Sequence, residues 1–259
     1  LFTNRGYCHW LRVHELPEAQ RNQKGRHIQN LLALGPDERV IAYLNVSSLQ
    51  DEAFVARHSL LFATQRGIIK KTPLLEYSRP RSKGIIALDI REGDGLVGVA
   101  LLEEPAAQDV VLVSRQGQAI RFPHAEVRPM GRNAAGVMGM RLDPDDELVA
   151  LVPVSQPEGY LFVLAEKGYG KATPLPEYRT THRGGKGIRT FHVTDKTGAL
   201  VAALQLVNLQ EELLLVTQEG QSIRFSAQEL SVRGRDTQGT LLIRVREGDR
   251  VVGVSVVRG

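Results

Sequence analysis

One pattern recurs five times along this chain, and it restricts the possible folds more than any other feature. Each copy has an apolar run that ends at a glycine, and successive glycines are 61, 50, 51 and 52 residues apart. These turn glycines are Gly6, Gly67, Gly117, Gly168 and Gly220. A glutamate follows each of them nine residues later, at Glu15, Glu76, Glu126, Glu177 and Glu229. A fixed period of this length is typical of solenoids, propellers and related arrays, whose copies pack side by side.

Within each copy, the residue pattern predicts about four short β-strands. The apolar run 110–114 and the alternating run 118–122 flank Gly117, and a glycine between two such runs is typical of a hairpin turn. Two further runs, such as 85–90 and 96–100, follow a second glycine and are separated by an acidic turn. The second glycines are Gly25, Gly84, Gly136, Gly187 and Gly239. No long segment has the apolar spacing of a helix, so we predict an all-β fold.

A single four-stranded blade exposes both of its faces, whereas blades packed around one axis cover each other. We therefore predict one propeller-like domain over residues 1–259, with repeats at about 1–58, 59–108, 109–158, 159–210 and 211–259. Hydrophobic residues make up 42% of the chain, which is enough for such a core. No run of 18 apolar residues occurs, so we expect no membrane span. The single cysteine, Cys8, allows no internal disulfide and favours a cytoplasmic protein.

Positive charge is concentrated at one place in every copy. We take the windows from one residue before each turn glycine to two residues after the second glycine, which are 5–27, 66–86, 116–138, 167–189 and 219–241. They hold 23 of the 33 Lys and Arg residues but only 8 of the 29 Asp and Glu residues. Equivalent positions in a ring share one radius and one height, so these windows predict a positive belt. Such a belt is the electrostatic footprint of a binding site for a polyanion.

The basic residues predicted to contact this polyanion recur at equivalent positions of the copies. They are Arg21, Lys24, Arg26, Lys70, Lys71, Arg79, Arg81, Lys83, Arg121, Arg132, Lys171, Arg183, Lys186, Arg224, Arg233 and Arg235. Such side chains suit phosphate oxygens and carry no sequence code by themselves. Aromatic residues make up only 5% of the chain, which argues against base stacking and favours the backbone of duplex DNA. The alternative is a solvated charged edge that keeps a β-array soluble.

The sequence contains no motif for catalysis or for metal binding. The repeated glutamate could act as a general base, but a catalytic carboxylate occurs once or as a pair. Five equivalent glutamates instead predict a structural role, either as a cap or as a partner of a neighbouring arginine. We therefore expect no catalytic residue, no metal site and no cofactor in this chain.

Several motifs resemble the C-terminal domain of the DNA gyrase A subunit, and the match extends over essentially the whole chain. They are Leu16-Pro17-Glu18-Ala19, Gly25-Arg26, Asn30-Leu31-Leu32, Lys70-Lys71-Thr72, Arg128-Pro129-Met130-Gly131-Arg132-Asn133 with Gly136-Val137, Gly168-Tyr169-Gly170-Lys171 and Gly234-Arg235-Asp236-Thr237-Gln238-Gly239. The resemblance implies a β-pinwheel, a propeller-like disc in which neighbouring blades exchange hairpins. It also implies a non-catalytic domain of an ATP-dependent type IIA topoisomerase, which wraps duplex DNA around a basic rim to support supercoiling.

The resemblance further implies the partners and the location of the chain. The partners would be duplex DNA, the N-terminal part of the gyrase A subunit, and the gyrase B subunit, in the bacterial cytoplasm at the nucleoid. ATP and Mg²⁺ would act on other domains of the holoenzyme. Two alternatives stay open: the similar domain of topoisomerase IV, and a protein-interaction propeller of the WD40 or kelch kind. The latter predicts the repeat without segregated charge, and neither the WD dipeptide nor the kelch double glycine recurs here.

Two features depart from the family pattern. The family disc often has six blades, whereas five repeats are readable in this sequence. The family heptapeptide Gln-Arg-Arg-Gly-Gly-Lys-Gly is expected upstream of Leu1. Segment 181–187 matches five of its seven positions, but it lies in the fourth repeat, so the role of the heptapeptide does not transfer to it.

Overall fold

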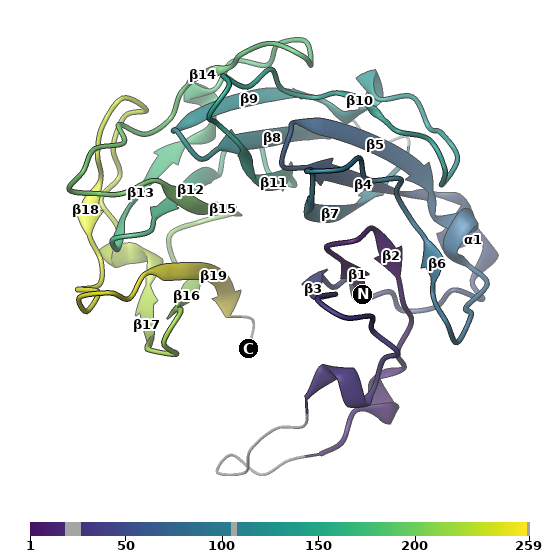
Figure 1. Cartoon of the computed structure of the whole chain (residues 1–259). Coiled ribbons are helices and arrows are strands. Elements are labelled where there is room, and N and C mark those ends of the chain that lie inside the picture. The colour runs from purple at the N-terminus through teal and green to yellow at the C-terminus, as the bar shows by residue number, and fades with distance from the viewer. Residues whose placement is uncertain (19–26, 105–107, 258–259) are drawn as a thin grey trace.

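The computed structural model describes residues 1–18, 27–104 and 108–257, and its strands form five small antiparallel sheets (Figure 1). The sheets lie side by side around an arc like the blades of a propeller, with the first and last sheets at its two ends (Figure 1). This arrangement confirms the predicted all-β, propeller-like fold. In the described part of the chain, four sheets have the predicted four strands and the fifth has three.

The strands of the five sheets follow the order of the repeats. Sheet 1 contains β3 (Val40–Ala42), β1 (Phe2–Thr3), β2 (Tyr7–Cys8) and β6 (Ile85–Ile86). Sheet 2 contains β10 (Val137–Met138), β5 (Ile68–Pro73), β4 (His58–Thr64) and β7 (Leu96–Glu103). Sheet 3 contains β11 (Leu148–Val154), β8 (Asp109–Ser114), β9 (Gln118–Pro123) and β14 (Ile188–Arg189). Sheet 4 contains β15 (Leu200–Leu206), β12 (Tyr160–Ala165), β13 (Tyr169–Pro174) and β18 (Thr240–Leu241), and sheet 5 contains β17 (Ser222–Ser226), β16 (Glu212–Thr217) and β19 (Val251–Val257).

Each of the first four sheets takes one strand from the following repeat. These exchanged strands are β6, β10, β14 and β18, which pair with β2, β5, β9 and β13 respectively. They lie on the outer side of the arc, whereas β7, β11, β15 and β19 lie on its inner side (Figure 1). Neighbouring blades therefore exchange single short strands, and this exchange ties each repeat to the one before it.

The turn glycines make room for this exchange. Gly117 has a φ of 84°, in the left-handed region that favours glycine. Its carbonyl oxygen accepts a hydrogen bond from the N–H of Thr190, at 2.8 Å, in the following repeat. A Cβ atom on Gly117 would overlap the carbonyl oxygen of Phe191. The glycine therefore lets the backbone of the next repeat pass directly over the hairpin.

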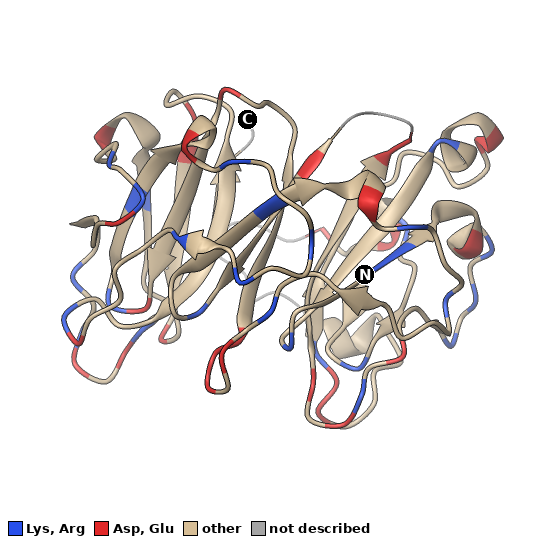
Figure 2. Cartoon of the chain, turned by 90° about the horizontal axis from the view of Figure 1, so that it is seen from above, with Lys and Arg blue, Asp and Glu red and all other residues tan. Residues whose placement is uncertain are grey.

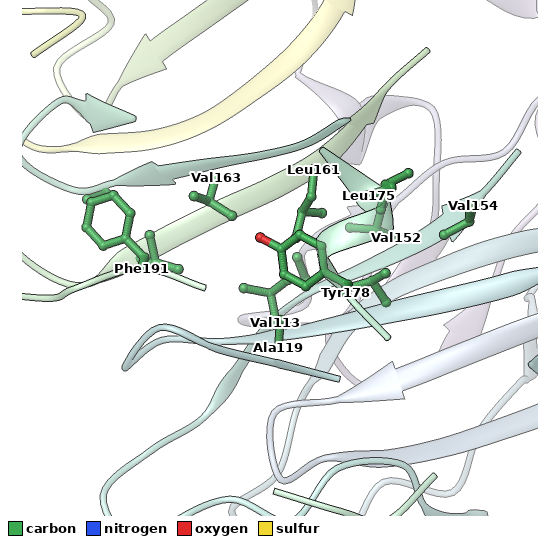
Figure 3. Packing of buried hydrophobic residues seen from close by; sticks show 13 residues of the cluster. Val113, Ala119, Val152, Val154, Leu161, Val163, Leu175, Tyr178 and Phe191 are labelled. Carbon is green, nitrogen blue, oxygen red and sulfur yellow. The ribbon is translucent and has the colours of Figure 1, made fainter. Parts of the chain in front are cut away.

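Apolar side chains fill the space between neighbouring sheets. In the cluster between sheets 3 and 4, Val113 of β8 packs with Leu161 and Val163 of β12, and the ring of Tyr178 lies beside them (Figure 3). All four side chains are buried. Since each middle strand has a sheet on either side, both of its faces are covered. This explains why these strands are continuous apolar runs and do not alternate in polarity.

Short helices connect the strands. A 3-10 helix follows the hairpin of each repeat: η1 (Val13–Glu15), η3 (Leu74–Tyr77), η4 (His124–Glu126), η5 (Leu175–Glu177) and η6 (Ala227–Glu229). A further 3-10 helix, η2, covers Ile28–Asn30, and the α-helix α1 covers Glu52–Ala56 with its N-terminus capped by Asp51. Among the residues that the structure describes, no helix has the length and apolar character needed to cross a membrane.

Candidate nucleic-acid interface

Charged residues are segregated on the folded chain. In the edge-on view, acidic segments gather at the upper and lower edges, and most basic segments lie between them (Figure 2). Many of these basic residues belong to the loops that lead from each 3-10 helix to an exchanged strand. We call them the rim loops, and they cover residues 78–84, 127–136, 178–187 and 230–239. Because the exchanged strands lie on the outer side of the arc, the rim loops line its perimeter.

Of these four loops, rim loop 78–84 has the densest group of accessible positive charges. Arg79, Arg81 and Lys83 are all exposed, and none of them forms an ion pair with another described residue. Arg233 in rim loop 230–239 is exposed in the same way. These four predicted contact residues are therefore accessible to the phosphate oxygens of a bound polyanion.

Two further exposed arginines are absent from the predicted set. Arg128 and Arg179 each lie two residues after the repeated glutamate, at the start of their rim loops. Neither has an ion-pair partner in the part of the chain that the structure describes. The sequence marks these two arginines only by their shared position, two residues after Glu126 and Glu177. An arginine stands at that position in only two of the five copies.

Burial corrects the prediction for Lys70 and Lys171. Neither side chain has any exposed surface, so neither faces a phosphate backbone. The ammonium group of Lys171 donates hydrogen bonds to the carbonyl oxygens of Gly234 (2.6 Å) and Arg235 (2.5 Å), and that of Lys70 donates to the carbonyl oxygen of Arg132. Desolvation by burial lowers the pKa of both amines to about 8. These two lysines support rim loops from the inside.

Lys71 and Arg121 are also used within the fold. Lys71 is buried, and its ammonium group lies 2.8 Å from the carboxylate of Glu104. The side chain of Arg121 is only 10% exposed and pairs with Asp109 at 2.7 Å. Its guanidinium group also donates to the carbonyl oxygen of Leu175 at 3.0 Å. Lys71 is therefore removed from the predicted surface, and Arg121 presents little of its charge to solvent.

Two exposed cations of the predicted set are already paired with carboxylates. The ammonium group of Lys186 lies 2.7 Å from Asp143, and Arg224 pairs with Glu212. Exposed ion pairs contribute only about 0–1 kcal/mol, so such a cation can exchange its carboxylate for a phosphate. Beside Lys186 lies a hollow of about 230 Å³, whose lining includes Arg179 and Lys186.

The repeated glutamates have the structural role that the sequence predicts. Glu126 accepts a hydrogen bond from the backbone N–H of Arg183 at 3.0 Å, and so holds the rim loop of the next repeat. Glu229 caps its own 3-10 helix by accepting from the N–H of Ser226 at 3.2 Å. The predicted contact residues Arg132, Arg183 and Arg235 are only partly exposed and donate hydrogen bonds to neighbouring backbone carbonyls.

Three predicted contact residues, Arg21, Lys24 and Arg26, lie outside the described residues. Within the described ranges, no three His, Cys, Asp or Glu side chains form a group that could hold a metal ion.

Comparison with known proteins identifies the class to which this arrangement belongs. The sequence profile of the family "DNA gyrase C-terminal domain, beta-propeller" matches residues 1–47, 58–103, 108–155, 159–206 and 211–258. These five matches follow the five repeats and cover most of the chain. The chain therefore belongs to the DNA gyrase C-terminal domain family, and the resemblance seen in its motifs is confirmed.

Similar sequences are those of DNA gyrase A subunits. The protein from Salmonella typhimurium is 40% identical over 256 residues, which cover 99% of this chain and 28% of the relative. The protein from Mycolicibacterium smegmatis is 41% identical, with 98% and 29% covered. This chain thus spans less than a third of the length of these relatives.

Solved structures show the same fold. A structure of the DNA gyrase A C-terminal domain matches with a TM-score of 0.84 at 25% identity, covering 98% of this chain and 80% of the other. The C-terminal domain of DNA topoisomerase IV matches with a TM-score of 0.85 at 24% identity, covering 99% and 77%. The similar scores show that the fold alone does not separate the two kinds of topoisomerase domain.

Proposed function

We propose that this chain binds duplex DNA along its rim and bends it, as the DNA-wrapping domain of a DNA gyrase A subunit. The observation that carries the proposal is the set of cations in equivalent rim loops, between two acidic edges, that are exposed and have no ion-pair partner among the described residues. Arg79, Arg81 and Lys83 form its densest part, and Arg128, Arg179 and Arg233 continue it along the perimeter. Membership of the gyrase family supports DNA as the polyanion.

The arrangement suits binding to the DNA backbone without base recognition. Guanidinium and ammonium groups contact phosphate oxygens, which are the same in every sequence. Cations spread along a curved rim hold a duplex only if it follows the curve. Bending a site of 20–30 bp costs of order 1–6 kcal/mol, so contacts from several repeats must act together. The acidic edges would repel the duplex and keep it on the basic band between them.

The rest of the supercoiling reaction would take place elsewhere. In this proposal the protein partners are the remaining part of the gyrase A subunit, together with the gyrase B subunit, and they use ATP and Mg²⁺ to pass one duplex through another. The wrapped segment would set the hand of that passage. Support comes from the relatives, which are gyrase A subunits more than three times as long as this chain.

Binding of a duplex of about 40 bp with a fluorophore at each end tests the proposal, because its straight length of about 136 Å at 3.4 Å per base pair prevents energy transfer. We expect tight binding at low salt and a rise in energy transfer. The slope of log K against log salt should be about −0.9 for each neutralised phosphate. The absence of binding at low salt would refute the proposal and favour a protein-interaction propeller.

A pair of matched variants locates the contact. Combining Arg79→Ala, Arg81→Ala and Lys83→Ala removes three rim cations and should reduce the salt slope by roughly 0.9 for each phosphate that is no longer neutralised. The control combines Arg91→Ala, Arg244→Ala and Arg246→Ala, three exposed cations beside the acidic turns 92–94 and 247–249. Both triple variants lose the same net charge. Equal losses of affinity would show that only net charge matters and that the rim is not the binding surface.

A further inference from the structure

The partly buried arginines of the rim loops join one exchanged strand to the next. Their guanidinium groups donate to the carbonyl oxygen of a residue in the preceding exchanged strand. These hydrogen bonds are Arg132 to Ile86 (3.0 Å), Arg183 to Met138 (2.9 Å) and Arg235 to Arg189 (3.2 Å). Together they link β6 to β10, β10 to β14 and β14 to β18 around the outer side of the arc (Figure 1).

The repeated glutamates hold the same arginines from the other side. Glu126 accepts from the backbone N–H of Arg183 at 3.0 Å, and Glu177 accepts from that of Arg235 at 3.2 Å. The carboxylate of Glu76 lies 3.6 Å from the guanidinium group of Arg132. Each glutamate belongs to the repeat before its arginine, so each contact crosses a boundary between blades.

The contact at Glu126 has the most hydrogen bonds of the three. Its second carboxylate oxygen lies 2.7 Å from Nδ1 of His182, next to Arg183 in the rim loop. Desolvation opposes ionisation of this carboxyl group, but the hydrogen bonds from Arg183 and His182 outweigh it and lower the pKa of Glu126. The carboxylate is therefore fully charged at neutral pH and available to hold the loop.

Buried side chains complete the support from below. Lys171, three residues after its turn glycine, donates to carbonyl oxygens of rim loop 230–239, and Lys70 supports rim loop 127–136 in the same way. The equivalent residue under rim loop 178–187 is Ile120. There a backbone hydrogen bond supports the loop: the N–H of Gly184 donates to the carbonyl oxygen of Gly139 at 2.7 Å.

We propose that each glutamate–arginine contact is a clasp that fixes the angle between neighbouring blades, and so fixes the curvature that bound DNA adopts. The clasps are Glu76 with Arg132, Glu126 with Arg183, and Glu177 with Arg235. Their residues are positioning residues, and the phosphate contacts belong to the exposed cations around them. This inference rests on the proposed function, because it requires that DNA binds along the rim. The clasps then determine how far the bound DNA bends, and the exposed cations determine how tightly it binds.

The fifth repeat provides a natural control. Glu229 is equivalent to Glu126 and Glu177, but it caps its own helix η6 and contacts no rim loop of another repeat in the described part of the chain. Glu158 is an exposed carboxylate with no ion-pair partner among the described residues. A variant with Glu158→Ala and Glu229→Ala therefore loses two negative charges and no clasp.

The decisive variant combines Glu126→Ala and Glu177→Ala and is measured on the end-labelled duplex. Simple charge reasoning predicts that removing two carboxylates tightens binding and leaves the bend unchanged. The clasp predicts a loss of energy transfer, with an unchanged salt slope and with affinity within about fivefold of the unsubstituted chain. The control variant should keep the full energy transfer. Equal energy transfer in both variants would overturn the inference.

A measurement without DNA keeps the two proposals separate. Amide hydrogen exchange reports directly on the N–H groups of Arg183 and Arg235, whose hydrogen bonds the glutamates accept. Exchange at both should accelerate in the Glu126→Ala, Glu177→Ala variant and not in the control, while the exchange of core strands such as β12 stays slow. Unchanged exchange would refute the clasp even if DNA binds. Failure of the unsubstituted chain to bind or shorten DNA would instead refute the proposed function.

Discussion

The fourth and fifth repeats share the same sequence pattern but differ in what covers them. In the fourth, β13 pairs with the exchanged strand β18, and its four central residues are buried. In the fifth, the equivalent strand β17 has no further strand on its outer edge in the described part of the chain, and only Phe225 is buried. The comparison shows that this strand of a blade is buried where a strand of the following repeat pairs with it, and is largely uncovered where the described residues provide no such strand.

The turn glycines should give the largest difference between the two repeats. Gly168 and Gly220 have nearly the same φ, 84° and 85°, so a Cβ atom strains both backbones equally. At Gly168 a Cβ would also overlap the carbonyl oxygen of Ile243, whereas Gly220 has open space. We expect Gly168→Ala to destabilise the fold by about 3 kcal/mol or more and Gly220→Ala by about 1–2 kcal/mol. Denaturant unfolding measures both, and equal losses would show that the exchanged strand does not need the glycine.

The buried lysine should give the next largest difference. Lys171→Met leaves the carbonyl oxygens of Gly234 and Arg235 without their donor, at a cost of about 1–3 kcal/mol. Ile223 occupies the equivalent position in β17 and is only partly buried. Ile223→Met should therefore change stability by less than about 0.5 kcal/mol. Denaturant unfolding at pH 7 compares the two variants, and a loss of stability at Ile223 equal to that at Lys171 would contradict this account.

Lys171→Met should also change how the unfolding free energy depends on pH. Burial lowers the pKa of Lys171 from 10.5 to about 8 in the folded chain. Between these values the unfolded chain binds more protons than the folded chain, so this lysine makes stability rise with pH. Lys171→Met should reduce the rise in unfolding free energy between pH 8 and pH 10. The rise that remains comes from Lys70, whose pKa is lowered in the same way. An unchanged profile of unfolding free energy against pH would show that the ammonium group titrates normally.

The sequence was sufficient for the fold because its signals are local and repeated. The turn glycines, the apolar runs and the second glycines each mark one element, and five copies in register indicate an array. The site was predicted less well, because the role of a cation depends on residues far along the chain. Lys171 resembles a surface lysine until Gly234, 63 residues later, is folded over it.

The exposed cations of the fourth and fifth repeats also differ in whether they have a carboxylate partner. We expect the smallest effect here, as a change in DNA affinity. Lys186 in the fourth repeat is held by Asp143, whereas Arg233 in the fifth has no carboxylate partner among the described residues. If Lys186 reaches a phosphate when DNA binds, Asp143 competes with that phosphate. Asp143→Asn should then tighten DNA binding by about two- to fivefold, the range expected of one exposed ion pair.

A charge-matched control separates this competition from the general effect of net charge. Glu158→Gln removes one carboxylate that pairs with no cation in the described part of the chain, so it should tighten binding less than Asp143→Asn. In the Lys186→Ala background, Asp143→Asn should lose its advantage over Glu158→Gln, because the released cation is absent. If that advantage persists, Asp143 acts only through long-range repulsion, and the Lys186 pair does not limit DNA binding.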